Sequence, residues 1–335
     1  MSIQKMSLLA AGSLLALGAG QATAGEMIVG LRDGGASIVL FDSALPSATL
    51  GASNVSGLGA GERLIGIDYR PHDQKVYGVV GQYDTGGVNV GARIVTIDPF
   101  TGNSSAIATL VSGNGGVAVR NEAMPILLNG QRFGLDVNPV VDLIRVVSDA
   151  EQNLATNPGG RAAGGAAGAT RIDGVLGRVQ GTPEIDFAIN GTAYSNNRDG
   201  AASTTQYTID SDADLLRIQS PPNNGTQVGD LALFLDLDLD GVQDAGEAFN
   251  ALADVGFDIS GDTDLAYLSS SQVGLPGEGI YTVNLATGAL SFIGAVDANL
   301  MDITVFSADV PEPAALALFG TALIGMGFAA RRRRA

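Results

Sequence analysis

The 335-residue chain contains no cysteine, no tryptophan and a single histidine. The missing cysteines exclude disulfide bonds, thiol nucleophiles and thiolate metal sites. One histidine also argues against a catalytic zinc centre, since such centres draw mainly on His and Cys ligands. That residue, His72, lies in a polar turn and has no Gly-x-Ser-x-Gly sequence beside it, so we expect no catalytic role for it.

Positive charge is also scarce, with 18 Lys and Arg against 35 Asp and Glu and a formal net charge of −17. This balance excludes binding to nucleic acid or anionic lipid, which requires clustered Lys and Arg. It suits an exported protein that stays soluble and attracts divalent cations. With 47 glycines and 45% hydrophobic residues, the chain favours many turns around a sizeable core, which is typical of an all-β fold.

The N-terminus has the three parts of a secretory signal. Lys5 precedes an apolar stretch over 6–20, and Ala22-Thr23-Ala24 has the small-x-small pattern that signal peptidase recognises. We therefore predict a signal peptide over 1–24, cut between Ala24 and Gly25. The alternative is a buried N-terminal helix.

The C-terminus has a different kind of signal. Pro311-Glu312-Pro313 is followed by an apolar run over 314–330 and by four arginines over 331–334. As a helix, the run is about 26 Å long and nearly spans a bilayer, while the arginines stay cytoplasmic. This predicts transient anchoring in the inner membrane by a transmembrane helix. A plain C-terminal anchor is the alternative.

The order of these parts resembles the PEP-CTERM sorting signal of Gram-negative bacteria, which in this chain covers 310–335. The resemblance implies that an exosortase-type membrane enzyme recognises and removes the tail. The protein is then released to the cell surface or the outside. It further implies an association with exopolysaccharide or the biofilm matrix.

Between the two signals, over 25–309, short patterns repeat. A Gly-x-Asp sequence occurs three times, with its acids at Asp68, Asp136 and Asp258. Nine residues after each acid comes a second β-rich stretch, centred on Tyr77, Arg145 and Tyr267. The equal offset predicts a hairpin of fixed length. The acids either cap strand ends by bonding to backbone or point into a central channel as a second cation site.

A third strand of each repeat ends on an acid or amide at Asp42, Asp98, Asn157, Asp210 and Asn284. The spacings between these markers are 56, 59, 53 and 74, which is the spacing of propeller blades with an insertion in the last. The strand over 301–306 is left over, and it fits the gap in the first blade. We therefore predict an all-β, five-bladed β-propeller closed by its C-terminal strand.

Two alternatives stay open, namely a six-bladed ring with one blade over 162–186 and a pair of β-sandwiches. The region over 26–306 also resembles an uncharacterised bacterial family, domain of unknown function number 4394. The resemblance is carried by Leu40-Phe41-Asp42, Gly66-Ile67-Asp68-Tyr69-Arg70-Pro71, Arg145-Val146-Val147-Ser148-Asp149, Tyr207-Thr208-Ile209-Asp210 and Leu285-Ala286-Thr287-Gly288. It implies a propeller-like fold and no particular activity.

One segment, 236–247, satisfies the twelve-residue calcium loop at every position. Its ligands are Asp236, Asp238, Asp240, the backbone carbonyl of Val242, Asp244 and a bidentate Glu247. Gly241 permits the sharp turn at the sixth position. The alternative is a half-buried strand, since leucines alternate with the acids from 233 to 239. We predict a structural Ca²⁺ site; Gly113-Asn114-Gly115-Gly116, by contrast, is a turn and no phosphate loop.

Taken together, the residues favour a non-enzymatic exported surface or matrix protein, a calcium-stabilised propeller that binds polysaccharide or a partner. The alternative is an extracellular enzyme, a sugar or lactone hydrolase or lyase using channel carboxylates and a cation.

Overall fold

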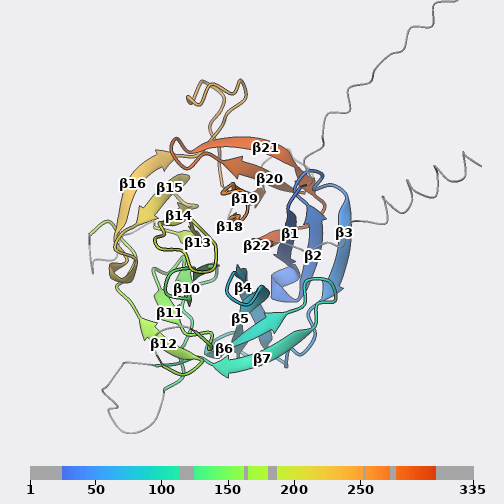
Figure 1. The fold of residues 1–335 in the computed structure, drawn as a ribbon, viewed down its shortest axis with the longest axis vertical. Coiled ribbons are helices and arrows are strands. Elements are labelled where there is room, and N and C mark those ends of the chain that lie inside the picture. Colours follow the sequence, from blue (N-terminus) through green and yellow to red (C-terminus); the bar gives the residue numbers. More distant parts are fainter. Residues whose placement is uncertain are drawn as a thin grey trace, which may run out of the picture.

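The repeated segments form antiparallel strands of five sheets that stand round a common axis in the computed structural model (Figure 1). The structure describes residues 25–112, 124–161, 165–179, 187–251, 254–271 and 277–306. The predicted five-bladed, all-β propeller is confirmed. The predicted signal peptide over 1–24, the tail over 310–335 and the turn over 113–116 lie outside the described residues.

Each blade has four antiparallel strands, which follow one another from the axis outward. Blade 1 contains β22 (Leu300–Phe306), β1 (Met27–Arg32), β2 (Ser37–Asp42) and β3 (Thr49–Asn54). Blade 2 contains β4 (Glu62–Arg70), β5 (Lys75–Tyr83), β6 (Asn89–Ile97) and β7 (Ser104–Thr109). Blade 3 contains β9 (Phe133–Asn138), β10 (Leu143–Ser148), β11 (Asn153–Thr156) and β12 (Ala169–Ile172).

Blade 4 contains β13 (Ile189–Tyr194), β14 (Gln206–Asp210), β15 (Leu215–Gln219) and β16 (Gln227–Ala232). Blade 5 contains β18 (Val255–Ile259), β19 (Ala266–Ser271), β20 (Glu278–Val283) and β21 (Ala289–Val296). Two short parallel strands extend the outer edges of the next blade, β8 (Val111–Ser112) beside β12 and β17 (Phe234–Leu235) beside β21. Single 3-10 turns are η1 (Asp33–Gly35) and η2 (Pro222–Asn224).

The ring closes as the sequence predicts. β22, the last described strand, pairs antiparallel with β1, the first, and Met27 lies opposite Phe306. The two ends of the described body therefore meet within blade 1. Because the closing strand is the innermost one, it also packs against β18 of blade 5 and β4 of blade 2. Closure thus joins three blades and pairs the edge of β1 that would otherwise be open.

One repeat marker is assigned to the wrong strand. Asp210 ends β14, the second strand of blade 4, and the third strand is β15. The reason is that both strand ends use the same turn chemistry: Asp210 Oδ1 accepts the backbone N–H of Ala213, as Asp98 Oδ1 accepts that of Thr101. The 74-residue interval therefore contains an extra strand as well as the inserted loop.

The six-bladed alternative is wrong for the described residues. Within 162–186, the residues 169–172 form β12, the outer strand of blade 3, and no further blade is built from the described part of that segment. Each blade needs four strands, and the described residues supply them for five blades.

The repeated glycines explain how the inner strands approach the axis. A Cβ at Gly256 would lie 2.5 Å from the backbone nitrogen of Ile303 in the next blade, and one at Gly134 would lie 2.9 Å from the carbonyl oxygen of Asn190. Only glycine permits such contact. Side chains two residues apart share a face of a strand, so the aspartate that follows each of these glycines faces the same crowded centre.

Candidate functional site

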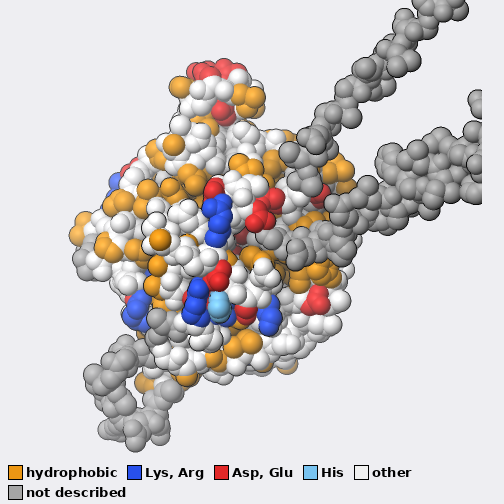
Figure 2. All heavy atoms as spheres, in the orientation of Figure 1, with side chains coloured by type: hydrophobic (Ala, Val, Ile, Leu, Met, Phe, Trp, Pro, Cys, Tyr) orange, Lys and Arg blue, Asp and Glu red, His pale blue; other side chains and the backbone are white. Residues whose placement is uncertain are grey.

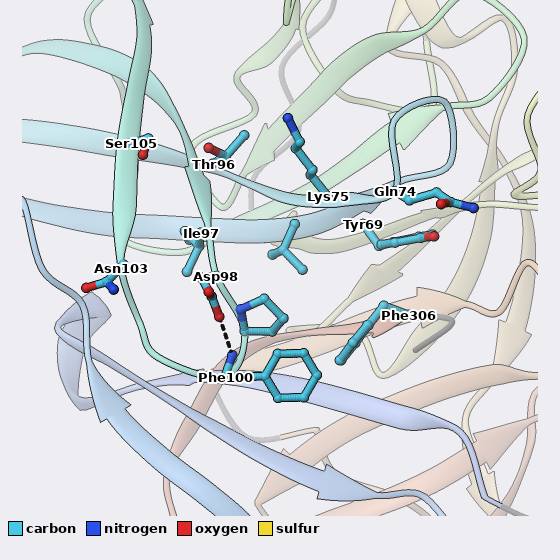
Figure 3. A pocket seen from close by; sticks show the side chains of 12 residues that line it. Tyr69, Gln74, Lys75, Thr96, Ile97, Asp98, Phe100, Asn103, Ser105 and Phe306 are labelled. Atoms are coloured by element: carbon cyan, nitrogen blue, oxygen red, sulfur yellow. Dashed lines mark hydrogen bonds between the residues drawn. The ribbon is translucent and has the colours of Figure 1, made fainter. Parts of the chain in front are cut away.

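A cavity of about 610 Å³ opens between blades 1 and 2 (Figure 3). Three aromatic rings form one part of its wall. Phe306, at the end of β22, stands edge-on to Phe100 with ring centres 6.1 Å apart and an interplanar angle of 78°. Tyr69, from β4, lies 6.4 Å from Phe306. Phe100 is 61% exposed, so its ring presents an apolar surface to ligands.

The opposite wall of this cavity is polar. Figure 3 shows Thr96, Ser105 and Lys75 across the opening from Phe100. Thr96 and Ser105 lie opposite each other on the paired strands β6 and β7. Lys75 starts β5, is exposed, and forms no ion pair with any residue in the described part of the chain. The arrangement can stack a flat apolar surface while bonding hydroxyl and acidic groups on its other side.

The turn that carries Phe100 is fixed by its own sequence. Asp98 ends the third strand of blade 2, and its Oδ1 accepts the backbone N–H of Phe100 at 2.9 Å and that of Thr101 at 3.1 Å. Gly102 follows with a φ of 72°, which the tight turn requires. This turn, which begins at the repeated acid after the third strand, therefore holds the exposed ring in place.

A second cavity of about 190 Å³ lies at the mouth of the central axis and shares Tyr69 and Gln74 with the first. Arginine and acidic side chains gather round the centre of this face in Figure 2. His72 lies here, 32% exposed, with Nδ1 3.4 Å from Asp199 Oδ1. Arg161 also contacts that carboxylate at 2.7 Å. The histidine thus faces an acid of blade 4.

Deeper on the axis, the structure brings the three Gly-x-Asp acids together. Asp68 on β4, Asp136 on β9 and Asp258 on β18 come from three different blades, and each can place a carboxylate oxygen within 4.8 Å of the others. Their exposed fractions are 1%, 0% and 1%. The acids therefore form one buried cluster, the central arrangement that the sequence left open beside strand capping.

Two of these acids also bond to backbone of the neighbouring blade. Asp68 Oδ2 accepts the N–H of Val137 at 2.8 Å, and Asp258 Oδ2 accepts that of Val305 at 2.6 Å. Each bond joins one inner strand to the next, so these acids link blades instead of capping strand ends. Asp136 differs, because neither of its carboxylate oxygens makes a hydrogen bond of good geometry.

Burial dominates the electrostatics of the cluster. Removal from water raises the pKa of Asp68 and Asp136 well above the ordinary value, and the negative charges of the neighbouring acids raise it further. Burial likewise raises the pKa of Asp302, on β22, well above the usual range. It raises the pKa of Asp258 to about 6, although hydrogen bonds from Val305 and Ile259 oppose the shift.

The predicted calcium loop is a separate site at the rim. The segment after β17 extends from the edge of the ring, and acidic side chains gather at its tip (Figures 1 and 2). Asp236, Asp238 and Asp240 can each place an oxygen within 4.8 Å of the others. Gly241 has a φ of 77°, as the sharp turn requires. The structure therefore brings these three predicted ligands together.

The end of the loop folds back on its beginning. Glu247 is only 4% exposed, and its Oε1 accepts the N–H of Leu237 at 2.9 Å while Oε2 accepts that of Asp244 at 2.7 Å. Val242, whose carbonyl is a predicted ligand, donates its N–H to Asp240 Oδ1 at 2.8 Å. Glu247 thus closes the loop in this structure.

The alternative interpretation of this segment, a half-buried strand from 233 to 239, holds for two residues only. β17 covers Phe234–Leu235, whereas Leu237 and Leu239 are 71% and 74% exposed. An alternating strand would bury one face of this leucine series. The segment is a loop from Asp236 onward.

Of the predicted processing residues, only Gly25 is described. Its successor Glu26 exchanges hydrogen bonds with Ser43, so the chain is tied to blade 1 directly after the predicted cleavage point. Ala24, Pro311, Glu312 and Pro313 lie outside the described residues, as does the predicted helix over 314–330. Within the described part of the chain, no helix is long and apolar enough to cross a membrane.

Sequence reasoning missed the cavity between blades 1 and 2. Phe100, Lys75 and Phe306 are separated by up to about 230 positions in the chain, and ring closure alone brings Phe306 to the others. The available signal was weak: an apolar ring placed inside an otherwise polar turn, next to a Pro that cannot continue a strand.

The chain was compared with known proteins and solved structures. No curated protein matches it. Similar folds include a chain of a nidogen–laminin complex (12% identity, 85% of this chain, 99% of that chain, TM-score 0.37). A Lactobacillus plantarum protein is also similar (9% identity, 84% of this chain, 100% of that chain, TM-score 0.38). The Dos1 propeller is similar as well (10% identity, 80% of this chain, 60% of that chain, TM-score 0.33). At these values the similarity carries no functional information.

Two families match the sequence directly. The PEP-CTERM protein-sorting motif covers residues 309–334, so the protein is exported with a C-terminal signal for exosortase-type processing. The second family covers residues 37–304, nearly all of the propeller. The chain therefore belongs to the family described as Domain of unknown function (DUF4394).

Proposed function

We propose that this protein is a non-enzymatic binding module of the cell surface or extracellular matrix, and that it holds an acidic polysaccharide in the cavity between blades 1 and 2. The observation that carries the proposal is the cavity itself. It combines an exposed aromatic ring, Phe100, with an unpaired ammonium group, Lys75, on a protein that is otherwise strongly acidic.

The chemistry of the two walls supports a sugar ligand. A sugar ring has one face of C–H groups that packs on an aromatic side chain and an edge of hydroxyls that bonds to polar groups. Thr96 and Ser105 supply hydroxyls at the opposite wall. Lys75 is the only lysine between the two terminal signals, and an ammonium there favours a sugar that carries a carboxylate.

Export supports the same class of ligand. The PEP-CTERM signal directs the protein outside the cytoplasm, where exopolysaccharide is an available partner. Release after removal of the tail would leave the propeller in the biofilm matrix. The full route is signal peptidase, transient inner-membrane anchoring and exosortase-type cleavage.

The rim loop over 236–247 is part of this proposal as a structural Ca²⁺ site. Asp236, Asp238 and Asp240 converge, and five carboxylates in twelve residues repel one another without a cation. Ca²⁺ prefers such hard oxygen ligands. The ion would stabilise an exposed insertion and take no part in ligand binding, since the loop and the cavity lie on different blades.

The alternative function, a hydrolase or lyase that uses channel carboxylates, is not favoured. Asp68, Asp136 and Asp258 are at most 1% exposed, so a sugar cannot contact them. A glycosidase needs two carboxyl groups flanking the bond to be cut. Burial of this cluster supports a structural role for it and a binding role for the open cavity.

The test is binding of the released form to polygalacturonic acid, with dextran as a neutral comparator. We expect saturable binding to the polyuronate only, weakened about tenfold or more by Phe100→Ala, since aromatic stacking contributes about 1–3 kcal/mol per ring. Lys75→Gln should weaken binding similarly and remove its salt dependence.

Phe292→Ala is the matched control. Phe292 is 49% exposed on β21 of blade 5, outside the cavity, and its loss should leave binding unchanged. Equal binding of the wild-type protein and both cavity variants, or stronger binding to dextran, would contradict the proposed site.

A further inference from the structure

The carboxylate of Asp136 has no charged partner that accounts for its burial. It is 0% exposed, and the contact that it makes with the backbone N–H of Tyr194 falls short of good hydrogen-bond geometry. In the described part of the chain, no ion pair involves Asp136, Asp68 or Asp258. A carboxylate removed from water is strongly unfavourable unless it is protonated, paired or bound to a metal. Asp136 is therefore a buried carboxylate without a counter-charge, in a cluster with two further acids.

The three acids lie close enough together to ligate one ion. Ca²⁺ binds oxygen at about 2.3–2.6 Å, so any two oxygens on the same ion are at most about 4.6–5.2 Å apart. The cluster holds one oxygen from each acid within 4.8 Å of the others. Mg²⁺ binds at about 2.0–2.1 Å and keeps several waters, which suits a buried cluster less well.

The hydroxyl of Thr304 also contacts two of the three acids. Thr304 Oγ1 accepts the N–H of Tyr69 at 2.8 Å and lies 3.0 Å from Asp68 Oδ1 and 3.1 Å from Asp258 Oδ2. A hydroxyl has only one proton to donate to the two carboxylates. The two contacts are therefore met by one shared proton, by a protonated carboxyl group, or by a cation that offsets the repulsion between the oxygens.

The position of the cluster shows what a bound ion would stabilise. Asp68, Asp136 and Asp258 lie on the inner strands of blades 2, 3 and 5, and Thr304 lies on the closing strand of blade 1. These strands meet only after the chain has closed into a ring. An ion held by all of them would stabilise the closed ring and would be trapped once folding is complete.

We propose that Asp68, Asp136 and Asp258 bind one Ca²⁺ on the propeller axis, with the Thr304 hydroxyl beside it. This site is distinct from the rim loop, and it does not depend on the proposed polysaccharide binding. The ion is structural, since the cluster is closed to solvent.

The first experiment measures the ion content of a variant without the rim site. The protein carrying Asp238→Asn and Asp240→Asn is unfolded in denaturant with a chelator, refolded in millimolar Ca²⁺ and passed through a desalting column. Mass spectrometry of the metal should then find about one Ca²⁺ per chain. Adding Asp136→Asn should remove it. No ion in the first variant, or one retained in the second, would overturn the proposal.

The second experiment needs no axial substitution and so does not depend on whether Asp136→Asn folds. The rim variant is refolded at pH 8 with Ca²⁺, with Mg²⁺ or with chelator alone. Ca²⁺ should raise the midpoint of thermal unfolding by about 5 to 10 °C over the other two conditions. Equal midpoints in all three would show that shared protons, and no ion, hold the acids together.

Discussion

Acidic side chains gather at two places in this propeller, and the two clusters differ in almost every physical respect. The rim cluster, 236–247, comes from one continuous segment, is largely exposed and bonds to its own backbone. The axial cluster of Asp68, Asp136 and Asp258 comes from three blades, is buried, and bonds to backbone of neighbouring blades. The same residue type therefore organises a local loop in one place and the whole ring in the other.

Removing an acid should therefore affect different amounts of the fold in the two clusters. Loss of a rim acid affects a segment that packs on one blade edge through β17. Loss of an axial acid unpairs backbone groups between inner strands, and those strands carry the closure of the ring. We therefore expect global effects from the axis and local effects from the rim.

The largest difference between the two clusters should appear when one acid is removed from each. Asp258→Ala leaves the buried N–H of Val305 in the closing strand without its acceptor. We expect a loss of about 2–4 kcal/mol in the free energy of unfolding, measured with urea. Asp238→Ala, in an exposed position, should change it by about 0.5 kcal/mol or less in the presence of chelator.

Asp258→Asn is the matched control for that pair. It keeps a carbonyl oxygen that can accept from Val305, so its cost should be clearly smaller than that of Asp258→Ala. Equal losses for the axial and rim alanine variants would show that the two clusters do not differ as described.

The pH dependence of stability should separate the clusters next. Burial raises the pKa of Asp258 from 3.8 to about 6, so the folded state holds a proton that the unfolded state loses near pH 4. In chelator, this stabilisation is complete below about pH 4 and is lost as the pH rises through about 6. A shift of this size corresponds to about 3 kcal/mol. The urea concentration at the unfolding midpoint should therefore decrease as the pH rises from 4.5 to 8.

The contributions of three other carboxyl groups must be separated from this effect. Burial also raises the pKa of Glu278, near blade 1, to about 7, and Glu278→Gln subtracts its share. Asp33 and Glu62 have lowered pKa values because Ser37 and Arg93 bond to them, and their contributions are lost only as the pH falls below the ordinary acid range. A midpoint that rises steadily from pH 4.5 to 8 would contradict burial of the axial acids.

The two clusters also differ in how well the sequence predicts them. The sequence predicts the rim loop residue by residue, because its predicted ligands follow one another at fixed spacing and its turn needs a glycine at Gly241. The axial cluster was visible only through repetition of Gly-x-Asp. Its meeting point depends on the number of blades and on strand order, and the misplaced Asp210 marker shows how one strand end can imitate another.

The cavity between blades 1 and 2 was beyond such reasoning altogether. Its wall joins Phe306, from the last strand, to Phe100 and Lys75 of blade 2. No local pattern specifies that neighbourhood, because it arises from ring closure and from the angle between two blades. What the sequence did specify was the closure itself, through a strand left over at the C-terminus.

The carboxylate of Glu26 differs from the axial acids although it is also partly buried between two blades. Glu26, which lies close after the predicted cleavage point, joins the same two blades as Asp258. Unlike the axial acids, its carboxylate accepts hydrogen bonds from several hydroxyl groups. Its oxygens accept the hydroxyls of Ser260, Thr263 at 2.9 Å and Tyr267 at 2.8 Å. Glu26→Gln should cost about 1–2 kcal/mol in the free energy of unfolding, measured with urea. Tyr267→Phe removes one donor only and should cost less; a larger loss from it would contradict this assignment.

The smallest expected effect on global stability comes from the rim, and it needs a local measurement. In a variant lacking axial Asp136, removing Ca²⁺ from the loop should lower the free energy of unfolding, measured with urea, by about 0.5 kcal/mol or less. Yet Glu-C protease, which cuts after acidic residues, should cleave within 236–247 several times faster in chelator than in millimolar Ca²⁺. The Asp238→Asn, Asp240→Asn variant should be cut equally in both conditions. Cleavage that is independent of Ca²⁺ in the wild-type loop would mean that Glu247, bonded to Leu237 and Asp244, closes it without an ion.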